Sequence, residues 1–299
     1  MINYTFIIPH HNAPQLLNRC LDSIPAREDV QVIVVDDNSE ENLRPVVTRK
    51  DVEAIYIDKQ HTQGAGHARN EGMKRAKGKW LLFVDCDDFL ADNALLILDM
   101  FKDSQSDIIF FKISAVNSDT LQPSNRCLAF NDYIDAHQSH SPMSEGTLRY
   151  IQCVPWGKMI RRSLVVDNHI QFEGIRYGND VIFSLRCGVM AKSIDSTKDI
   201  LYVVTDREGS LVTQVSYDSM LCRYKVGVRR AKILVDNKKY LYLGSLSPNI
   251  KAIKRSFGAD KVSDFYSCAA EHGFTKTAML AYSVIGRIGS LLRYLFRKI

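Results

Sequence analysis

The chain has 299 residues, of which 45% are hydrophobic and 24% charged, proportions that are ordinary for a folded globular protein and exclude a disordered chain. That length allows one large core with an appended region. The seven cysteines are widely spaced, odd in number and without a CxxC pair, so they indicate neither a disulfide framework nor a zinc site. No basic segment precedes a long apolar run at the amino terminus, so we expect no secretory signal and a location in the reducing cytosol.

Charge is distributed unevenly along the chain. Residues 219–299 carry 16 Lys and Arg against 4 Asp and Glu, a net charge of +12, which leaves −7 for residues 1–218. A basic segment can bind nucleic acid, but no helix-turn-helix, zinc or aromatic-platform pattern accompanies it, so we expect no nucleic-acid partner. An anionic membrane surface fits the basic segment better.

The predicted elements begin with a strand, a loop and a helix. Residues 4–9 form a short apolar run, and apolar residues between 16 and 24 then recur at helical spacing. The next apolar run, 30–35, is continuous and of the kind that is buried on both faces of a sheet. It stops at Asp36 and Asp37, so a strand that ends in carboxylates is predicted here.

Two more strands continue the alternation of strands and helices. The runs 52–58 and 79–85 flank a glycine-containing loop and a helix, and the second run ends in the acidic turn formed by Asp85, Asp87 and Asp88. This order predicts an α/β fold, Rossmann-like, with a mostly parallel central sheet and helices on both faces. Ligands bind beyond the carboxyl ends of such strands, so we expect both acidic clusters to face one crevice.

The second half of the chain has weaker patterns. A polar, serine-rich stretch over 117–146 is interpreted as a loop, and from about residue 218 the pattern is helical and basic to the end. The other predicted elements are a helix at 94–101, a strand at 107–113, helical pieces at about 147–153, 161–168 and 180–190, and a strand at 200–205.

The acidic turn predicts a metal site. Asp85, Asp87 and Asp88 place three carboxylates within one turn of chain, where their repulsion is costly unless a cation neutralises them. Ligands that are all oxygen favour Mg²⁺ or Mn²⁺, which keep positions for water and phosphate oxygens. The alternative is that Asp88 or Asp92 only caps the following helix, but a cap uses one carboxylate and not three.

The earlier carboxylates and one arginine are further candidates. Asp36 and Asp37 form either a turn with a helix cap or part of a nucleotide pocket, and the acidic turn favours the pocket. Arg69 adds a permanent cation beside that turn, suited to a base carbonyl or a phosphate, while a solvated helix charge is the alternative.

Five segments in this order resemble the family-two glycosyltransferases with the GT-A fold, especially the bacterial members that build polysaccharides. They are 7–12 (IIPHHN), 21–24 (LDSI), 34–39 (VVDDNS), 66–72 (GHARNEG) and 78–88 (GKWLLFVDCDD). Weaker matches are Trp156 to Lys158, Gly178 to Phe183 and Tyr202 to Ser210.

The resemblance implies a site for a nucleotide-sugar donor. Pro9, Asp36 and Asp37 would line the nucleobase and ribose pocket, with Arg69 and Asn70 nearby. Within the acidic turn, the resemblance implies that Asp87 binds the metal, that Asp85 contacts the ribose or sugar, and that Asp88 supports both.

On the acceptor side, the resemblance implies that Asp180 is the catalytic base. The family usually has Glu-Asp where this chain has Asn179 and Asp180, and a helix cap is the alternative for Asp180. Trp156 and Lys158 would shape an acceptor platform, with a half-buried tryptophan as the alternative.

These expectations describe a metal-dependent, inverting glycosyltransferase. A divalent ion neutralises the departing diphosphate while a carboxylate takes the proton of the acceptor hydroxyl, so one displacement transfers the sugar. By resemblance alone we favour a uridine diphosphate donor and a glycan or lipid-linked glycan acceptor in cell-surface polysaccharide synthesis. The alternatives are a non-catalytic glycosyltransferase-like scaffold and a metal-dependent phosphotransferase, whose key acid would follow an earlier strand.

We expect a GT-A catalytic domain over 1–215, with a nucleotide-binding half at 1–115 and an acceptor-side half at 116–215, and a basic helical extension over 216–299. Arginines interrupt the apolar segment 278–299, which argues against a membrane-spanning helix and favours an interfacial helix on the inner face of the cell membrane. The alternative for this segment is a helix docked on the enzyme or on a second subunit.

Overall fold

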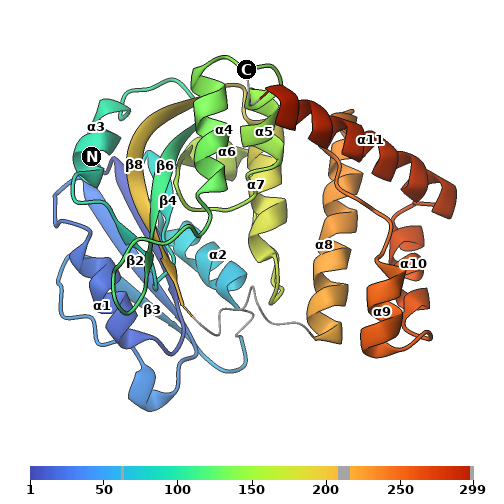
Figure 1. Cartoon of the computed structure of the whole chain (residues 1–299). Coiled ribbons are helices and arrows are strands. Elements are labelled where there is room, and N and C mark those ends of the chain that lie inside the picture. Colours follow the sequence, from blue (N-terminus) through green and yellow to red (C-terminus); the bar gives the residue numbers. More distant parts are fainter. Residues whose placement is uncertain (62–63, 208–215, 297–299) are drawn as a thin grey trace.

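One eight-stranded sheet organises the first two thirds of the chain in the computed structural model, which describes residues 1–61, 64–207 and 216–296 (Figure 1). In space, the strands follow the order β3-β2-β1-β4-β7-β6-β8-β5. They are β1 (Tyr4–His10), β2 (Val30–Asp37), β3 (Val52–Ile57), β4 (Trp80–Phe83), β5 (Phe89–Leu90), β6 (Ile108–Asn117), β7 (Lys158–Arg161) and β8 (Ile194–Asp206). Strands β1 to β4 pair in parallel with one another, and β6 pairs in parallel with β8. Strand β7 pairs antiparallel with both β4 and β6, and β5 pairs antiparallel with β8. The predicted mostly parallel sheet is therefore confirmed.

Helices cover both faces of this sheet. They are α1 (Pro14–Asp22), α2 (Ala65–Arg75), α3 (Ala94–Met100), α4 (Ala129–Gln138), α5 (Ser144–Tyr150), α6 (Arg162–Asp167) and α7 (Asn179–Met190), with the short 3-10 helix η1 (Glu41–Leu43). Successive strand residues point to opposite faces, so Phe6 and Ile8 of β1 pack with Leu17 of α1 in one core. Ile7 packs in a second core together with Phe183 of α7.

The structure corrects two element predictions in the second half. The stretch 117–146 is not all loop, because it contains the ten residues of α4 and the start of α5. Only Ile134 and Ala136 of α4 are buried, so the helical periodicity is weak in the sequence. Strand β7 was missed, since it has only four residues and is formed by pairing between β4 and β6.

The carboxyl-terminal region is helical, as predicted. It contains α8 (Tyr217–Asp236), η3 (Tyr240–Tyr242), α9 (Ile250–Phe257), α10 (Val262–Glu271) and α11 (Lys276–Phe296). Its core is continuous with the first part, because Leu185 of α7 and Tyr150 of α5 join Val228 and Leu234 of α8 in one buried cluster. The predicted boundary at residue 215 lies outside the described residues, and the division into two halves stays a prediction.

Helix α11 docks on the chain itself through small side chains. A Cβ atom at Gly286 would lie 2.5 Å from the carbonyl oxygen of Leu243, and one at Gly289 would lie 1.8 Å from that of Leu241. Ser283, also on this face, accepts hydrogen bonds from two backbone N–H groups of the preceding loop. Helix α11 is therefore docked on the enzyme itself, which was one of the two alternatives for the apolar segment at the end of the chain. Among the helices described, none combines the length and the apolar character that crossing a bilayer requires.

Candidate active site

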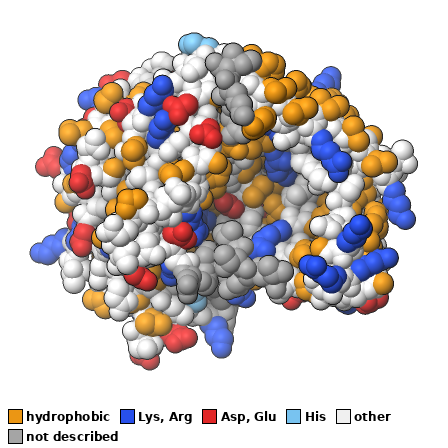
Figure 2. All heavy atoms as spheres, in the orientation of Figure 1, with side chains coloured by type: hydrophobic (Ala, Val, Ile, Leu, Met, Phe, Trp, Pro, Cys, Tyr) orange, Lys and Arg blue, Asp and Glu red, His pale blue; other side chains and the backbone are white. Residues whose placement is uncertain are grey.

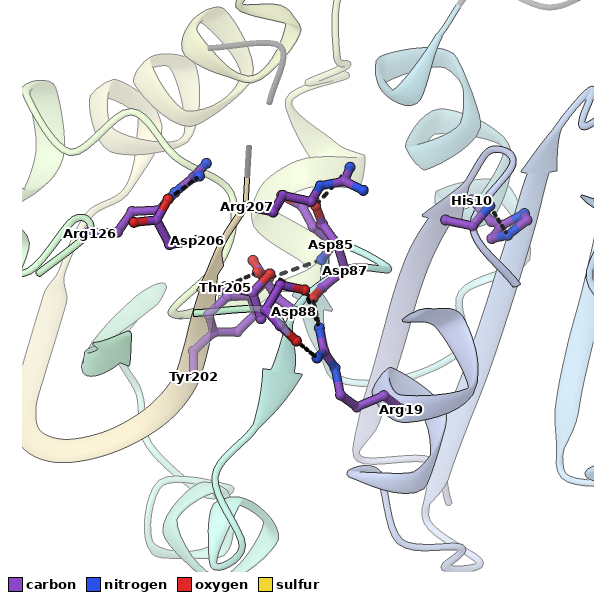
Figure 3. A network of polar contacts seen from close by, with 12 residues as sticks. His10, Arg19, Asp85, Asp87, Asp88, Arg126, Tyr202, Thr205, Asp206 and Arg207 are labelled. Carbon is purple, nitrogen blue, oxygen red and sulfur yellow. Dashed lines mark hydrogen bonds and ion pairs between the residues drawn. The ribbon is translucent and has the colours of Figure 1, made fainter. Parts of the chain in front are cut away.

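The acidic turn lies directly after β4, at the carboxyl end of the parallel strands, and Figure 3 shows it beside the end of β8. Asp85, Asp87 and Asp88 each offer a carboxylate oxygen, and these oxygens lie within 4.8 Å of one another. The side chains of Asp85 and Asp87 are 31% and 28% exposed, whereas Asp88 is 5% exposed. Two of the three carboxylates can therefore reach a ligand, and the third lies behind them.

The end of β8 holds Asp88 in place. The Tyr202 hydroxyl donates to Oδ2 of Asp88 over 2.7 Å, and the Thr205 backbone N–H donates to Oδ1, also over 2.7 Å (Figure 3). The Tyr202 hydroxyl also accepts from the backbone N–H of Asp85 at 3.0 Å. Burial, followed by the neighbouring Asp87 and Asp85 carboxylates, raises the pKa of Asp88 to about 8. Both carboxylate oxygens of Asp88 are thus engaged by the end of β8, and its support of a metal or donor site stays a prediction.

Two arginines neutralise the turn. Arg207 follows β8, and its Nη2 lies 3.2 Å from Oδ2 of Asp87. Arg19 of α1 donates from Nη2 to the carbonyl oxygen of Asp87 over 2.8 Å. Burial, and then Asp85, raises the pKa of Asp87, while Arg207 lowers it. Sequence reasoning missed both arginines, and the only signal was the weak family match over 202–210, whose last three residues lie outside the described part.

Arg69 of α2 connects the acidic turn to the acceptor side. Its guanidinium donates from Nη2 to Oδ1 of Asp85 over 2.5 Å and from Nη1 to Oδ1 of Asn179 over 2.9 Å. Its carbon Cζ lies 5.3 Å from the centre of the Phe172 ring. Arg69 is 5% exposed, so the alternative of a solvated helix charge is wrong.

The same helix fixes the segment that leads to Asp180. Asn70 donates from Nδ2 to the carbonyl oxygen of Phe172 over 3.0 Å and accepts the Phe172 N–H at Oδ1 over 2.9 Å. A Cβ atom at Gly66 would lie 2.3 Å from the carbonyl oxygen of Glu173, so only glycine permits this approach. Both polar groups of the Asn70 side chain thus bind backbone, and a donor contact for Asn70 stays a prediction.

Asp180 lies in the first turn of α7, after Gly178 in the left-handed conformation at φ +73°. The side chain is half-buried, and the helix has no side-chain cap. Burial raises the pKa of Asp180, and the largest opposing effect is the charge of Arg69. The structure therefore brings Asp180 into the same cluster of charges as Arg69 and Asp85.

The two carboxylates at the end of β2 differ in their environment. Asp36 is 1% exposed, and its carboxylate contacts Nδ1 of His10 at 2.8 Å and accepts the Ser39 N–H at 3.2 Å. Asp37 accepts the Gly64 N–H at Oδ2 over 2.9 Å, whereas its buried Oδ1 has no hydrogen-bond partner within the described ranges. Asp36 thus organises a turn, whereas donor contacts at the unpartnered Oδ1 of Asp37 and at the buried Pro9 stay predictions.

Trp156 and Lys158 lie inside the protein. Trp156 is 7% exposed and stacks on Tyr202, with ring centres 5.4 Å apart and an angle of 8° between the planes. Lys158 is 4% exposed and donates from Nζ to the carbonyl oxygen of Gln152 over 2.6 Å. Neither side chain offers an exposed face, so the acceptor platform stays a prediction that their burial does not support.

Comparison with known proteins identifies the family to which the chain belongs. The model of Glycosyl transferase family 2 matches residues 5–165, more than half of the chain. A poly(ribitol-phosphate) beta-glucosyltransferase of Bacillus spizizenii is 29% identical over 216 residues, which are 69% of this chain and 32% of that protein. The chain thus spans about a third of that relative's length.

Two solved structures have a similar fold. A TarS fragment from Staphylococcus aureus in complex with UDP-GlcNAc aligns with a TM-score of 0.61 at 19% identity, over 96% of this chain and 91% of that one. A mannosyltransferase from Pyrobaculum calidifontis in complex with GDP-Man and Mn²⁺ aligns with a TM-score of 0.56 at 17% identity, over 97% and 87% of the two chains. The predicted GT-A architecture is confirmed, and the chain belongs to glycosyl transferase family 2.

Proposed function

We propose that this enzyme moves a sugar from a nucleotide-sugar to a hydroxyl group of an acceptor, with a divalent metal ion and with inversion at the anomeric carbon. The observation that carries the proposal is the set of contacts made by Arg69, which bonds Asp85 of the acidic turn and Asn179 beside Asp180. A donor held at the turn and an acceptor held at Asp180 would then meet at one place. These contacts support the proposal, because such a transfer requires the donor and the acceptor to be held in a fixed relative position.

The acidic turn has the ligands for a hard divalent cation. Asp87 would bind Mn²⁺ or Mg²⁺, since its carboxylate is partly exposed and has a raised pKa that a bound cation would lower. Asp85 contributes a second oxygen nearby, although Arg69 already bonds that carboxylate. When bound, the ion would neutralise the charge that develops on the leaving diphosphate. Asp88 would keep the turn rigid through Tyr202 and Thr205.

Asp180 would accept the proton of the acceptor hydroxyl as that oxygen attacks the anomeric carbon. Its raised pKa makes it a better base than an exposed carboxylate while the charge of Arg69 favours the ionised form. Attack from the face opposite the diphosphate inverts the configuration in one displacement, so no nucleophile from the protein is needed. Arg207 lies near Asp87, so its guanidinium would help to neutralise the negative charge of a diphosphate bound there.

The donor pocket would lie at the ends of β1 and β2. The free Oδ1 of Asp37 can accept one N–H group of a base, which uracil provides at N3. We therefore favour a UDP-sugar, in line with the UDP-GlcNAc bound to the similar TarS fragment. The acceptor would be a glycan or a lipid-linked glycan in cell-surface polysaccharide synthesis, as the name of the Bacillus spizizenii relative suggests.

A non-catalytic scaffold is the second candidate, because Asn179 stands where a glutamate is usual in the resemblance described above. Asn179 bonds Arg69 without adding a negative charge. A scaffold would bind the donor and release no nucleoside diphosphate, so the measurement of diphosphate release separates the two functions.

We also propose a cytoplasmic enzyme held peripherally on the inner face of the cell membrane by the exposed side of α11. Five apolar side chains on that side are between 47% and 64% exposed, namely Leu280, Val284, Ile288, Leu291 and Leu295. Their spacing of three and four residues makes one stripe, and α11 contains no acidic residue. Lys276 and Arg287 are exposed on the same helix, and Figure 2 shows Lys and Arg side chains over the helical region. An apolar stripe with basic neighbours suits an anionic bilayer surface.

A screen of nucleotide-sugars for thermal stabilisation of the full chain tests the donor proposal without knowledge of the acceptor. We expect one UDP-sugar to raise the unfolding temperature in the presence of Mn²⁺ and to lose most of that effect when EDTA is added. Equal stabilisation with and without metal would contradict the proposed metal site.

A further inference from the structure

We propose that Arg229 of the basic helical extension is a positioning residue for the proposed base, because its ion pair with Glu173 holds the loop that ends beside Asp180. The proposal rests on the role of Asp180 as base. It gives the extension a part in catalysis that is separate from the membrane contact proposed for α11, since α8 carries it and the exposed stripe of α11 does not.

The loop in front of Asp180 is closed on itself. It covers residues 173–179, and the backbone N–H of Glu173 donates to the carbonyl oxygen of Asn179 over 3.3 Å. That carbonyl belongs to the peptide unit that joins Asn179 to Asp180, and a peptide unit is planar and rigid. The position of Glu173 is therefore passed to the backbone of Asp180 through one hydrogen bond.

Helix α2 contacts both ends of this loop. A Cβ atom at Gly66 would lie 2.3 Å from the carbonyl oxygen of Glu173 and 2.9 Å from the Cβ atom of Asn179. Arg69, on the same helix, donates to the side chain of Asn179 and also bonds Asp85 of the acidic turn. These contacts tie the loop to the donor side of the proposed site.

Helix α8 contacts the same loop from the extension. Cys222, Val226 and Arg229 are separated by four and three residues, so they lie on one face of α8. The thiol of Cys222 donates to the carbonyl oxygen of Tyr177 over 3.6 Å, and a Cβ atom at Gly178 would lie 3.6 Å from the methyl groups of Val226. Figure 1 shows α8 beside α7, the helix into which the loop leads. The loop is therefore held both by α2 and by α8.

The contact made by Arg229 is the charged one. Its Nη2 donates to Oε2 of Glu173 over 3.0 Å, and its Nε lies 2.7 Å from Oε1 of the same carboxylate. A guanidinium that meets both oxygens of a carboxylate fixes its direction as well as its distance. The two side chains are only 29% and 22% exposed, so water and salt screen the pair only in part. Within residues 1–61, 64–207 and 216–296, Glu173 forms no other ion pair, so α8 supplies the cation that holds it.

The test combines the full-length Arg229→Gln variant with the base variant. Mn²⁺-dependent release of UDP from a UDP-sugar should fall roughly tenfold in Arg229→Gln, because a small misplacement of the base is enough for such a loss. The affinity for UDP with Mn²⁺, measured by calorimetry, should be unchanged, and the unfolding temperature should fall by no more than about 4 °C. In the Asp180→Asn background, the same substitution should cause no further loss, since the base that Arg229 positions is already absent.

Two further variants and a control complete this experiment. Glu173→Gln should reproduce the loss, so the proposal can still be tested if the arginine variant does not fold. The double variant Glu173→Gln with Arg229→Gln should lose no more than either single variant, because both substitutions break the same contact. The matched control is Lys232→Gln, since Lys232 lies on the same helix and pairs with Asp236. It should release UDP at the wild-type rate.

Three outcomes would overturn the proposal. They are a wild-type rate in folded Arg229→Gln or Glu173→Gln, a further loss of similar size in the Asp180→Asn background, and a fall in UDP affinity that matches the fall in rate. The last outcome would make the ion pair a general support of the fold. Failure of the base itself is recognised separately, because Asp180→Asn alone would then release UDP at the wild-type rate.

Discussion

Arg69 and Asn179 lie 110 residues apart in the chain and are joined by a hydrogen bond of 2.9 Å from Nη1 to Oδ1. The second terminal nitrogen of the same guanidinium holds Asp85, so one rigid side chain determines the distance between the acidic turn and the start of α7. A planar fork with several donors can serve two acceptors in this way, whereas an ammonium group cannot.

The variant Arg69→Lys should therefore keep the charge and lose the link. We expect the transfer rate to fall by roughly ten- to a hundredfold, because misplacement by about 1 Å is enough for such losses. Steady-state rates of diphosphate release measure this. Arg75→Lys on the exposed side of the same helix, where Arg75 pairs with Glu53, is the control and should be close to wild type. Equal rates for both variants would show that the link is dispensable.

Asp180→Asn should separate chemistry from binding. The amide keeps the size of the side chain but removes the basic carboxylate, so transfer should fall by about two to four decades while the donor affinity is unchanged. Calorimetric titration with the donor and a rate assay together test this. Asp218→Asn is the matched control, because Asp218 also lies in the first turn of a helix. If both variants transfer sugar at the wild-type rate, Asp180 only stabilises its helix.

The pH dependence of stability should depend on Asp88. Its pKa is raised to about 8, so the folded protein holds a proton that the unfolded chain releases near pH 4. The stabilisation from this group is complete below pH 4 and is lost as the pH rises through 8. The metal-free protein should therefore unfold at a lower temperature at pH 8.5 than at pH 6, by on the order of 3 °C.

Mn²⁺ should offset that loss, so its stabilising effect should be larger at pH 8.5 than at pH 6. Differential scanning fluorimetry with and without EDTA measures both trends. Asp88→Asn should flatten the pH dependence, and Asp92→Asn, which lies outside the acidic turn, should retain it. A metal-free protein whose stability rises between pH 6 and pH 8.5 would contradict the role given to Asp88.

The exposed stripe of α11 should control binding to anionic vesicles. Removal of the helix is a poor test, because Met279 is part of a buried core and Gly286 packs against Leu243. The double variant Ile288→Glu with Leu291→Glu changes only exposed positions and should abolish co-sedimentation with anionic vesicles at low salt.

The control for this experiment is Leu96→Glu with Met100→Glu, since both residues are exposed on α3, far along the chain from α11. It should sediment with vesicles as the wild type does. Unchanged binding by the α11 variant would exclude the stripe as the lipid contact, and a change in oligomeric state would identify a second copy of the chain as its partner.

The sequence predicted the elements that are regular and locally encoded. Continuous apolar runs predicted β1 and β2. The expectation that Asp37 and the acidic turn face one crevice stays a prediction. What it could not predict depends on contacts between distant segments. Strand β7 exists because β4 and β6 pair with it, and the role of Asn70 depends on the backbone of Phe172, which lies 102 residues away.

The burial of Lys158 was also not predictable from the sequence, because a lysine two residues after Trp156 is ordinarily expected to be exposed. Arg207 and Arg19 were missed for a related reason. Each contacts Asp87 from an element that is distant in the chain, and only the packing of α1 and the end of β8 against the turn brings them together (Figure 3).

The central claim, metal-dependent glycosyl transfer at the acidic turn, is tested most directly by diphosphate release from nucleotide-sugars. Wild-type protein and Asp87→Ala would be compared with Mn²⁺ and with EDTA, with Asp92→Ala as the control. We predict that the wild type and Asp92→Ala release UDP from one UDP-sugar only with Mn²⁺, and that Asp87→Ala loses at least about two decades of this rate while it remains folded. Release that continues in EDTA, or that is undiminished in folded Asp87→Ala, would contradict the account.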